Sequence, residues 1–287
     1  MTEVDDRVTV EEVEFALPRA GITLRGRRRA GAGIPTLLLH GWLDNCASFA
    51  PLLHRAGSLA GELVAVDLPG HGLSDPVTSL TCSYFDHVAT ILELVHTQGW
   101  DRINLIGHSL GGALSSLVAG LRPGLIDRLV LIDAIGPLSQ QPDSGRETIA
   151  RYLDAYLADR PAPVYRSRGQ AVMARVALAD ILLDTAQLLV ERDLHPVPGG
   201  FSWRSDNRLR YPSPVIFTEP QVLSYLNSIT APTLLVHAER TALHEPFYPA
   251  RFTAVPDMRQ VTLPGGHHLH IENPDQVSEA ILGFLTS

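Results

Sequence analysis

INLIGHSLGG, residues 103–112, is the stretch that decides the fold of this chain. Its first half is a continuous apolar run, typical of a strand that is buried on both faces of a parallel sheet. The pattern Gly-x-Ser-x-Gly follows at once, and a helix is expected from Leu110 onward. Gly107 and Gly111 allow the backbone to make a tight turn beside neighbouring chain. Strand, sharp turn and helix together predict that Ser109 is an exposed nucleophile at a sheet edge.

Similar apolar runs recur along the chain with helical sequence between them, at 35–40, 63–68, 129–134, 232–238 and 259–264. One connecting segment, residues 84–98, carries apolar side chains at the spacing of one helix face. This alternation predicts an α/β fold with a mostly parallel central sheet that is flanked by helices. Residues 8–17 and 22–27 alternate between apolar and polar, so we expect an antiparallel ribbon at the sheet edge.

The regular pattern is interrupted between residues 135 and 230. Helical sequence at 146–160, 168–183 and 184–193 is followed by a stretch rich in Pro, Gly and Arg. We predict that residues 1–134 and 231–287 form the core, and that residues 135–230 are an inserted helical lid (cap). Such a lid would cover the carboxyl edge of the sheet, where α/β folds bind ligands. Phe201 and Trp203 in the lid suggest an apolar substrate group.

Composition and charge exclude several classes of protein. The chain has 287 residues, 45% of them hydrophobic, and a formal net charge of −8, which gives no support to a nucleic-acid partner. Cys46 and Cys82 are too few for a disulfide framework, so a reducing compartment is expected. The acidic N-terminus does not resemble a signal peptide, and no run reaches the roughly 18 apolar residues of a membrane span. These features predict a soluble, cytoplasmic protein and leave its oligomeric state open.

A basic run near the N-terminus is the exception to this acidic balance. It comprises Arg25, Arg27, Arg28 and Arg29. We interpret it as a solvated turn between the two early strands rather than as a binding site.

A serine hydroxyl becomes a good nucleophile only when a base removes its proton. LPGGHHLHIENP, residues 263–274, follows the last predicted strand, and His267 behind its two glycines is the predicted base. His268 and His270 are its rivals. The cluster lacks a second ligand set with zinc spacing, so we expect no metal and no cofactor.

An oxyanion that forms on a substrate carbonyl needs hydrogen-bond donors. Two backbone N–H groups are in suitable places. Trp42 follows the strand predicted at 35–40, and Leu110 follows Ser109. We predict that these two groups form an oxyanion hole.

Four motifs now resemble those of one superfamily, the α/β-hydrolases: LLLHGW at 37–42, DLPGHGLSD at 67–75, GHSLGG at 107–112 and GGHHLHIENP at 265–274. Within it, HGWLDNCASF at 40–49 and DAIGPL at 133–138 are most similar to the serine hydrolase-like proteins. The resemblance implies the α/β-hydrolase fold and a catalytic triad in the chain order Ser, acid, His.

The acid departs from the pattern of the superfamily. The resemblance implies an Asp in the loop after the strand at 232–238, but Thr241 occupies that position. We expect the acid to be Asp133, at the end of the strand at 129–134, where a buried strand opens at the catalytic edge. Glu239, or less favourably Glu245, remains the alternative.

These residues and the resemblance predict a carboxylesterase, whose partner is a small-molecule ester. Ser109 would form an acyl-enzyme intermediate with a small or medium, apolar carboxylic ester, and His267 would activate water to release it. Two alternatives remain open at this point. The same scaffold can act as a carbon–carbon bond hydrolase or lyase, and the missing loop Asp allows a non-catalytic ligand receptor.

Overall fold

An eight-stranded sheet forms the centre of the computed structural model, which describes residues 9–55, 61–179, 181–241 and 247–287. The strand order is β1-β2-β4-β3-β5-β6-β11-β12. The strands are β1 (Val10–Leu17), β2 (Ile22–Arg29), β3 (Thr36–Leu39), β4 (Leu63–Val66), β5 (Ile103–His108), β6 (Ile126–Ile132), β11 (Thr233–Ala238) and β12 (Met258–Leu263). All neighbours from β4 to β12 are parallel, and β1 and β2 form an antiparallel edge. The predicted α/β fold with a mostly parallel sheet is confirmed.

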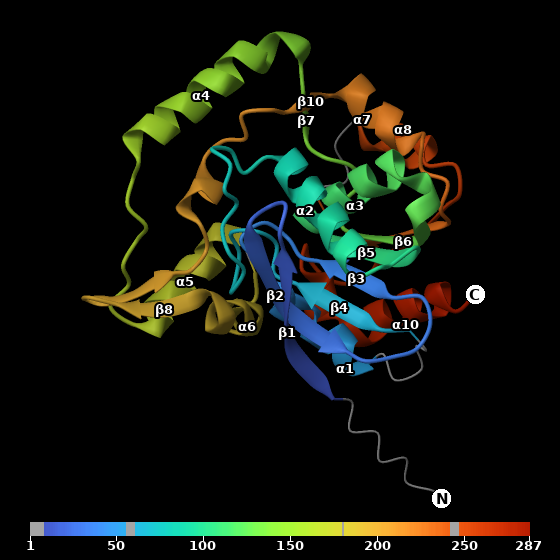
Figure 1. Cartoon of the computed structure of the whole chain (residues 1–287), viewed down its shortest axis with the longest axis horizontal. Coiled ribbons are helices and arrows are strands. Elements are labelled where there is room, and N and C mark those ends of the chain that lie inside the picture. Colours follow the sequence, from blue (N-terminus) through green and yellow to red (C-terminus); the bar gives the residue numbers. More distant parts are fainter. Residues whose placement is uncertain (1–8, 56–60, 180, 242–246) are drawn as a thin grey trace, which may run out of the picture.

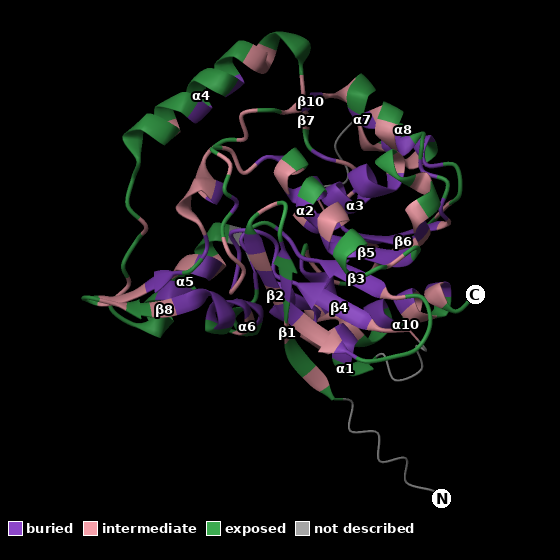
Figure 2. Ribbon diagram, viewed as in Figure 1, coloured by how far each residue is buried: buried purple, intermediate pink, exposed green. Residues whose placement is uncertain are grey.

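Helices cover both faces of this sheet (Figure 1). They are α1 (Ala50–Arg55), α2 (Tyr84–Thr97), α3 (Leu110–Leu121), α8 (Tyr248–Ala254), α9 (Leu269–Glu272) and α10 (Pro274–Leu285). Leu37 and Leu39 of β3 belong to the apolar cluster on the side of α2 and α3, whereas Leu38 belongs to the cluster on the side of α1 and α10. Strands β3, β4 and β5 are buried along their whole length because both faces of the sheet are covered, as Figure 2 shows.

In the part of the chain between β6 and β11 that the structure describes, there are four α-helices and two small sheets. The helices are α4 (Gly145–Ala158), α5 (Arg168–Ala179), α6 (Leu183–Asp193) and α7 (Glu219–Leu226). The sheets pair β7 (Ser139–Gln140) with β10 (Phe217–Thr218), and β8 (Leu194–Val197) with β9 (Gly200–Trp203). Helix α4 stands apart from the sheet and is largely exposed (Figures 1 and 2).

This segment is not uniform in its packing. Side chains of α5, α6 and β9 form an apolar cluster of their own, which includes Val172, Leu189 and Trp203. Val222 and Leu226 of α7, by contrast, pack in the same cluster as α2 and α3. The division of the chain into a core and a lid at residues 135 and 230 stays a prediction. Helix α7 lies within the predicted lid in the sequence, but it packs against helices of the predicted core.

The arginine run does not form the solvated turn that we predicted. These arginines lie in β2, and the β1 carboxylates opposite them are their partners: Arg25 pairs with Glu14, Arg27 with Glu12 and Arg28 with Glu11. Opposite charges on facing positions stabilise an antiparallel pair, and at a sheet edge both side chains keep access to water. Which carboxylate faces which arginine follows from the register of β1 and β2, which the sequence pattern does not show.

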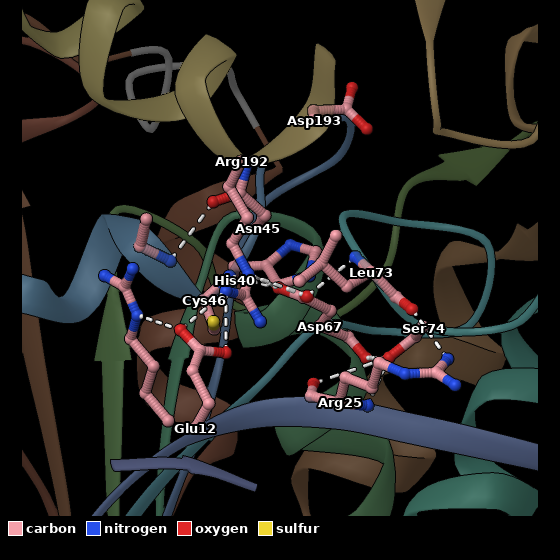
Figure 3. Close-up of polar contacts among 12 residues, drawn as sticks. Glu12, Arg25, His40, Asn45, Cys46, Asp67, Leu73, Ser74, Arg192 and Asp193 are labelled. Carbon is pink, nitrogen blue, oxygen red and sulfur yellow. Dashed lines mark hydrogen bonds and ion pairs between the residues drawn. The ribbon is translucent and has the colours of Figure 1, made fainter. Parts of the chain in front are cut away.

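An internal ion-pair network joins α6 to the core (Figure 3). Arg192 Nε donates to both carboxylate oxygens of Asp67, at 3.1 and 2.9 Å, and its Nη1 donates to both oxygens of Glu12 on β1 at 2.9 Å. Asp67 is fully buried and also accepts the backbone N–H groups of Cys46 and Leu73. One guanidinium therefore links α6 to the first strand and to the turn after β4.

The next residue, Asp193, is a buried carboxyl group without a directly bonded cation among the described residues. It is 4% exposed and accepts the N–H of Ser205 at 2.9 Å. Burial raises the pKa of Asp193 to about 7. The folded-state pKa thus exceeds the unfolded value of about 4, so this group favours folding at low pH and loses that contribution as the pH rises toward 7.

We therefore expect Asp193→Asn to raise the melting temperature at pH 8 by on the order of 5 °C. An amide oxygen can still accept the Ser205 N–H, while the buried charge is removed. The gain should be smaller at pH 5, where the carboxyl group is already protonated in the folded protein. Asp154→Asn on exposed α4 is the matched control. A gain of equal size at both pH values would contradict the argument.

Candidate active site

The turn that carries Ser109 has the strained geometry that its glycines predict. Ser109 lies between β5 and α3 with a φ of 52°, and its N–H donates to the Ile132 carbonyl at 3.1 Å. A Cβ atom at position 107 would lie 2.2 Å from the Gly111 oxygen, and one at position 111 would lie 1.9 Å from the Leu39 oxygen. Only glycine fits at either place, and the resulting turn exposes the Ser109 hydroxyl at the carboxyl edge of the sheet.

His267 lies between Ser109 and Asp133. Its Nε2 is 2.9 Å from Ser109 Oγ, and its Nδ1 is 2.6 Å from Asp133 Oδ2. Because the carboxylate can only accept, Nδ1 carries the hydrogen, and Nε2 is left to accept the hydrogen of the serine. Three residues that are far apart in the sequence therefore form one hydrogen-bonded chain at the sheet edge.

Asp133 is held in place on several sides. It follows β6 with a φ of 47°, its N–H donates to the Val236 carbonyl of β11 at 2.8 Å, and its Oδ1 accepts the Ala238 N–H at 3.1 Å. The Thr241 side chain also makes a hydrogen bond to it. Burial would raise the pKa of Asp133, but the hydrogen bonds from His267, Thr241 and the Ala238 N–H outweigh it and hold this pKa below its ordinary value. The carboxylate is therefore ionised at neutral pH.

The alternative acids occupy other positions. Glu239 is exposed, and its backbone N–H donates to the Leu263 carbonyl at 3.0 Å. Glu245 lies outside the described residues. The Nδ1 atom of His267 is bonded to Asp133, so this geometry favours Asp133 over Glu239.

The two residues predicted to supply oxyanion donors, Trp42 and Leu110, lie on the loop after β3 and at the start of α3. Leu110 is the first residue of α3, so its N–H has no carbonyl partner within the helix. The Gly111 N–H donates to the His40 carbonyl at 3.0 Å, which holds the loop that contains Trp42 against the start of α3. The Trp42 indole N–H donates to the Leu209 carbonyl at 2.8 Å. Trp42 and Leu110 line the same cavity as Ser109.

The rival histidines are buried behind His267. His268 Nε2 donates to Asp44 at 3.1 Å, and neither ring nitrogen of His270 has a hydrogen-bond partner among the described residues. His108 Nε2 donates to the backbone carbonyl of His267 at 2.8 Å, and burial lowers the pKa of His108 to about 4. The hydrogen bonds of His108 and His268 therefore help to fix the loop that carries His267.

Asp44, His108 and His268 bring potential metal-ligand atoms within 4.8 Å of one another. Arg175 already donates to Asp44 through its Nη2 atom. A cation placed here would have to share Asp44 with that guanidinium, so the donor set fits a buried ion pair better than a metal.

Ser109 opens into a cavity of about 480 Å³. Aromatic side chains from distant parts of the chain form much of its wall: Trp42, Tyr84, Tyr152, Tyr211 and Tyr248. Phe201 and Trp203, which suggested the apolar substrate group, do not line it. They pack in the cluster of α5, α6 and β9 instead, so the prediction that these two side chains contact the substrate was wrong.

Apart from the ionised Asp133, which is bonded to His267, the ionisable groups of this cavity carry little net charge at neutral pH. Burial lowers the pKa of His87 to about 4 and raises the pKa of Cys82 to about 11. Arg208 is neutralised by Asp206, with Nη2 at 2.6 Å from Oδ2, and it also donates to the carbonyls of Val77 and Ser79. The cavity therefore suits an uncharged, apolar group.

Some features of the site gave no signal in the sequence. The four cavity tyrosines belong to separate segments, and no spacing pattern connects them. The hydrogen bond from Thr241 to Asp133 also had no signal in the sequence, because it depends on where Thr241 lies relative to the end of β6. Among the described residues, no helix is both long and apolar enough to cross a membrane.

Comparison with known proteins gives consistent results. A family model described as "Alpha/beta hydrolase family" matches residues 36–280. A serine hydrolase-like protein from Dictyostelium discoideum is 30% identical, over 87% of this chain and 74% of its own. A 2-(acetamidomethylene)succinate hydrolase from Mesorhizobium japonicum is 28% identical over 92% of each chain. The crystal structure of a hypothetical protein from Pseudomonas aeruginosa PAO1 is 36% identical with a TM-score of 0.90, and covers 96% of this chain and 100% of that one.

Proposed function

Because the chain belongs to the alpha/beta hydrolase family, we propose that it is a serine hydrolase that cleaves an uncharged carboxylic ester. One observation carries this proposal. Ser109, His267 and Asp133 form a continuous hydrogen-bonded chain whose serine end opens into an apolar cavity. That is the arrangement that acyl transfer to water requires.

In the proposed mechanism, Ser109 Oγ attacks the ester carbonyl while His267 Nε2 takes its proton. The imidazolium that forms is stabilised by ionised Asp133, and it then protonates the leaving alcohol. Water enters next, gives a proton to His267 and attacks the acyl group on Ser109. Collapse of this second intermediate releases the carboxylic acid and returns the proton to the serine.

The negative charge on the substrate oxygen needs donors that are already oriented. We assign this role to the backbone N–H groups of Leu110 and Trp42. Leu110 lies at the N-terminus of α3, where the helix dipole adds a favourable potential. Loss of one such donor typically costs about 10² to 10³ in rate.

The wall of the cavity narrows the substrate class. Its aromatic and aliphatic side chains favour an apolar acyl or alcohol group of small to medium size. A succinate derivative, such as the one named for the Mesorhizobium japonicum relative, carries carboxylates and would need unpaired cations. Arg208 is the one arginine among the described lining residues, and Asp206 and two carbonyls already occupy it.

A fluorophosphonate probe tests the proposed nucleophile directly. We expect the wild-type protein to be labelled and Ser109→Ala to lose the label entirely, because the probe reacts with an activated serine. Ser224→Ala, at an exposed serine on α7, is the matched control and should label normally. A wild-type protein that resists the probe would support the ligand-receptor alternative and contradict the proposal.

Nitrophenyl esters of increasing acyl chain length then test the substrate class. We expect kcat/KM to rise as the acyl chain grows from acetyl and to fall when the chain exceeds the cavity. Labelling of Ser109 without hydrolysis of any ester would refute the carboxylesterase assignment, and would leave carbon–carbon bond hydrolysis or lyase chemistry on the same residues.

A further inference from the structure

A second cavity, of about 170 Å³, lies in the segment between β6 and β11. Its walls include Leu43, Tyr165, Arg175, Trp203 and Arg210, and it shares no lining residue with the cavity of Ser109. Pro163 and Leu178 also line it, and both residues are exposed, so the cavity opens to the surface. We call it the arginine cavity.

Two guanidinium groups in the arginine cavity have buried hydrogen-bond donors without partners. Arg175 is 5% exposed, and its Nε has no partner among the described residues. The same holds for Nη1 of Arg210. A buried N–H group left unbonded is costly, so two of them in one small cavity indicate a missing acceptor.

The charges in the arginine cavity also indicate that a negatively charged acceptor is missing. Arg175 is paired with Asp44. Arg210 has no ion pair within the described part of the chain, and its one side-chain bond is a long contact of 3.5 Å from Nη2 to Ser205 Oγ. Burial lowers the pKa of Arg210, the nearby Asp193 carboxylate opposes this shift, and the positive charge of Arg175 adds to it. A guanidinium group without an ion pair, beside a second guanidinium group that has an unbonded donor, creates a site for an anion.

Asp193, which also lines the cavity, is only partly available as the anion that would balance the charge of Arg210. It accepts the Ser205 N–H, and burial raises its pKa to about 7, so part of the population is uncharged at neutral pH. Arg210 then lacks a full counter-charge. Around the guanidinium groups, the walls are apolar: Leu43, Ala174 and Leu178, with Trp203 and Tyr165 as aromatic surfaces.

We propose that the arginine cavity is an accessory binding site for a small carboxylate with an apolar or aromatic group. The carboxylate oxygens accept hydrogen bonds from Arg175 Nε and Arg210 Nη1, and the apolar group lies against Leu43 and Trp203. Planar guanidinium groups bind carboxylates with several donors at once, which fits two arginines on one small acid. The site is separate from Ser109 and does not depend on the esterase proposal.

A crystal soaked with 4-bromobenzoate tests the location, because anomalous scattering identifies the bromine atom. We expect a bromine peak in the arginine cavity, with the carboxylate between Arg175 and Arg210. The uncharged analogue 4-bromobenzamide should give a much weaker peak at this place. A bromine peak only in the cavity of Ser109, or no peak at all, would overturn the proposal.

Isothermal titration with the same acid tests the role of the charge. Arg210→Met keeps the apolar stem of the side chain and removes its donors, so we expect Kd to rise by about 10- to 100-fold. Arg204→Met, at an exposed arginine in the same segment, should leave Kd unchanged. Equal affinity of the Arg210→Met and wild-type proteins would refute the assignment, whatever their activity toward esters.

Discussion

Asp133→Asn is expected to lower kcat by about 10³- to 10⁴-fold, with a much smaller effect on KM. The amide can neither select the Nδ1–H tautomer of His267 nor stabilise the imidazolium that forms when Ser109 loses its proton. Initial rates with the preferred nitrophenyl ester measure the loss. Glu239→Gln is the matched control, because Glu239 is exposed, and it should retain nearly full activity. A large loss in Glu239→Gln with normal activity in Asp133→Asn would move the acid to the loop after β11.

A second variant distinguishes a misplaced acid from a misfolded protein. The Thr241 side chain hydrogen-bonds to Asp133, so a carboxylate at position 241 would lie close to the place of the lost one. We expect Thr241→Asp, added to Asp133→Asn, to recover part of the activity. Thermal unfolding of the single and double variants provides the check on folding.

Arg192→Met is expected to destabilise the protein by about 3 to 5 kcal/mol, the largest effect on stability that we anticipate. The substitution leaves the Asp67 carboxylate fully buried without its cation, and Glu12 loses the same partner. Urea denaturation measures the change. Arg28→Met removes a partly exposed partner of Glu11 on the sheet edge and should cost at most about 1 kcal/mol.

The double substitution Asp67→Asn with Arg192→Met isolates the cause. If an unpaired buried charge is responsible, the double variant should be more stable than Arg192→Met alone, because the charge is gone. Identical losses in both variants would show that packing of the arginine stem, rather than the ion pair, stabilises the link between α6 and the core.

The sequence predicted the parts of the fold that depend on local patterns. Apolar runs such as Leu234 to Ala238 form strands of the parallel sheet, because both of their faces are covered. Such a strand can be predicted without knowing which strands lie beside it. The sharp turn at Ser109 was predictable because it requires glycine at two fixed positions, 107 and 111. The arginine run was misread because its partners are the acidic side chains of β1, and only the register of the pair shows them.

The candidate acid shows where sequence reasoning reaches its limit. An apolar strand followed by Asp133, together with Thr241 in the loop, led us to predict Asp133 as the acid, with Glu239 as the alternative. The support given by Thr241 and the Ala238 N–H depends on how two neighbouring strands end side by side. The wall of the Ser109 cavity was even less predictable from the sequence, since its tyrosines come from α2, α4, α8 and the loop before β10.

The indole of Trp42 connects two parts of the molecule, and this has an optical consequence. Trp42 is 44% exposed and lines the cavity beside Ser109, and its indole N–H is bonded to the Leu209 carbonyl in the segment before α7. A bound apolar ligand would exclude water from the ring, and a movement of that segment would break the indole hydrogen bond. The chain has only three tryptophans, so a change at Trp42 should be visible in the intrinsic fluorescence. This signal can report both occupancy of the cavity and displacement of the segment that contains Leu209, without any added label.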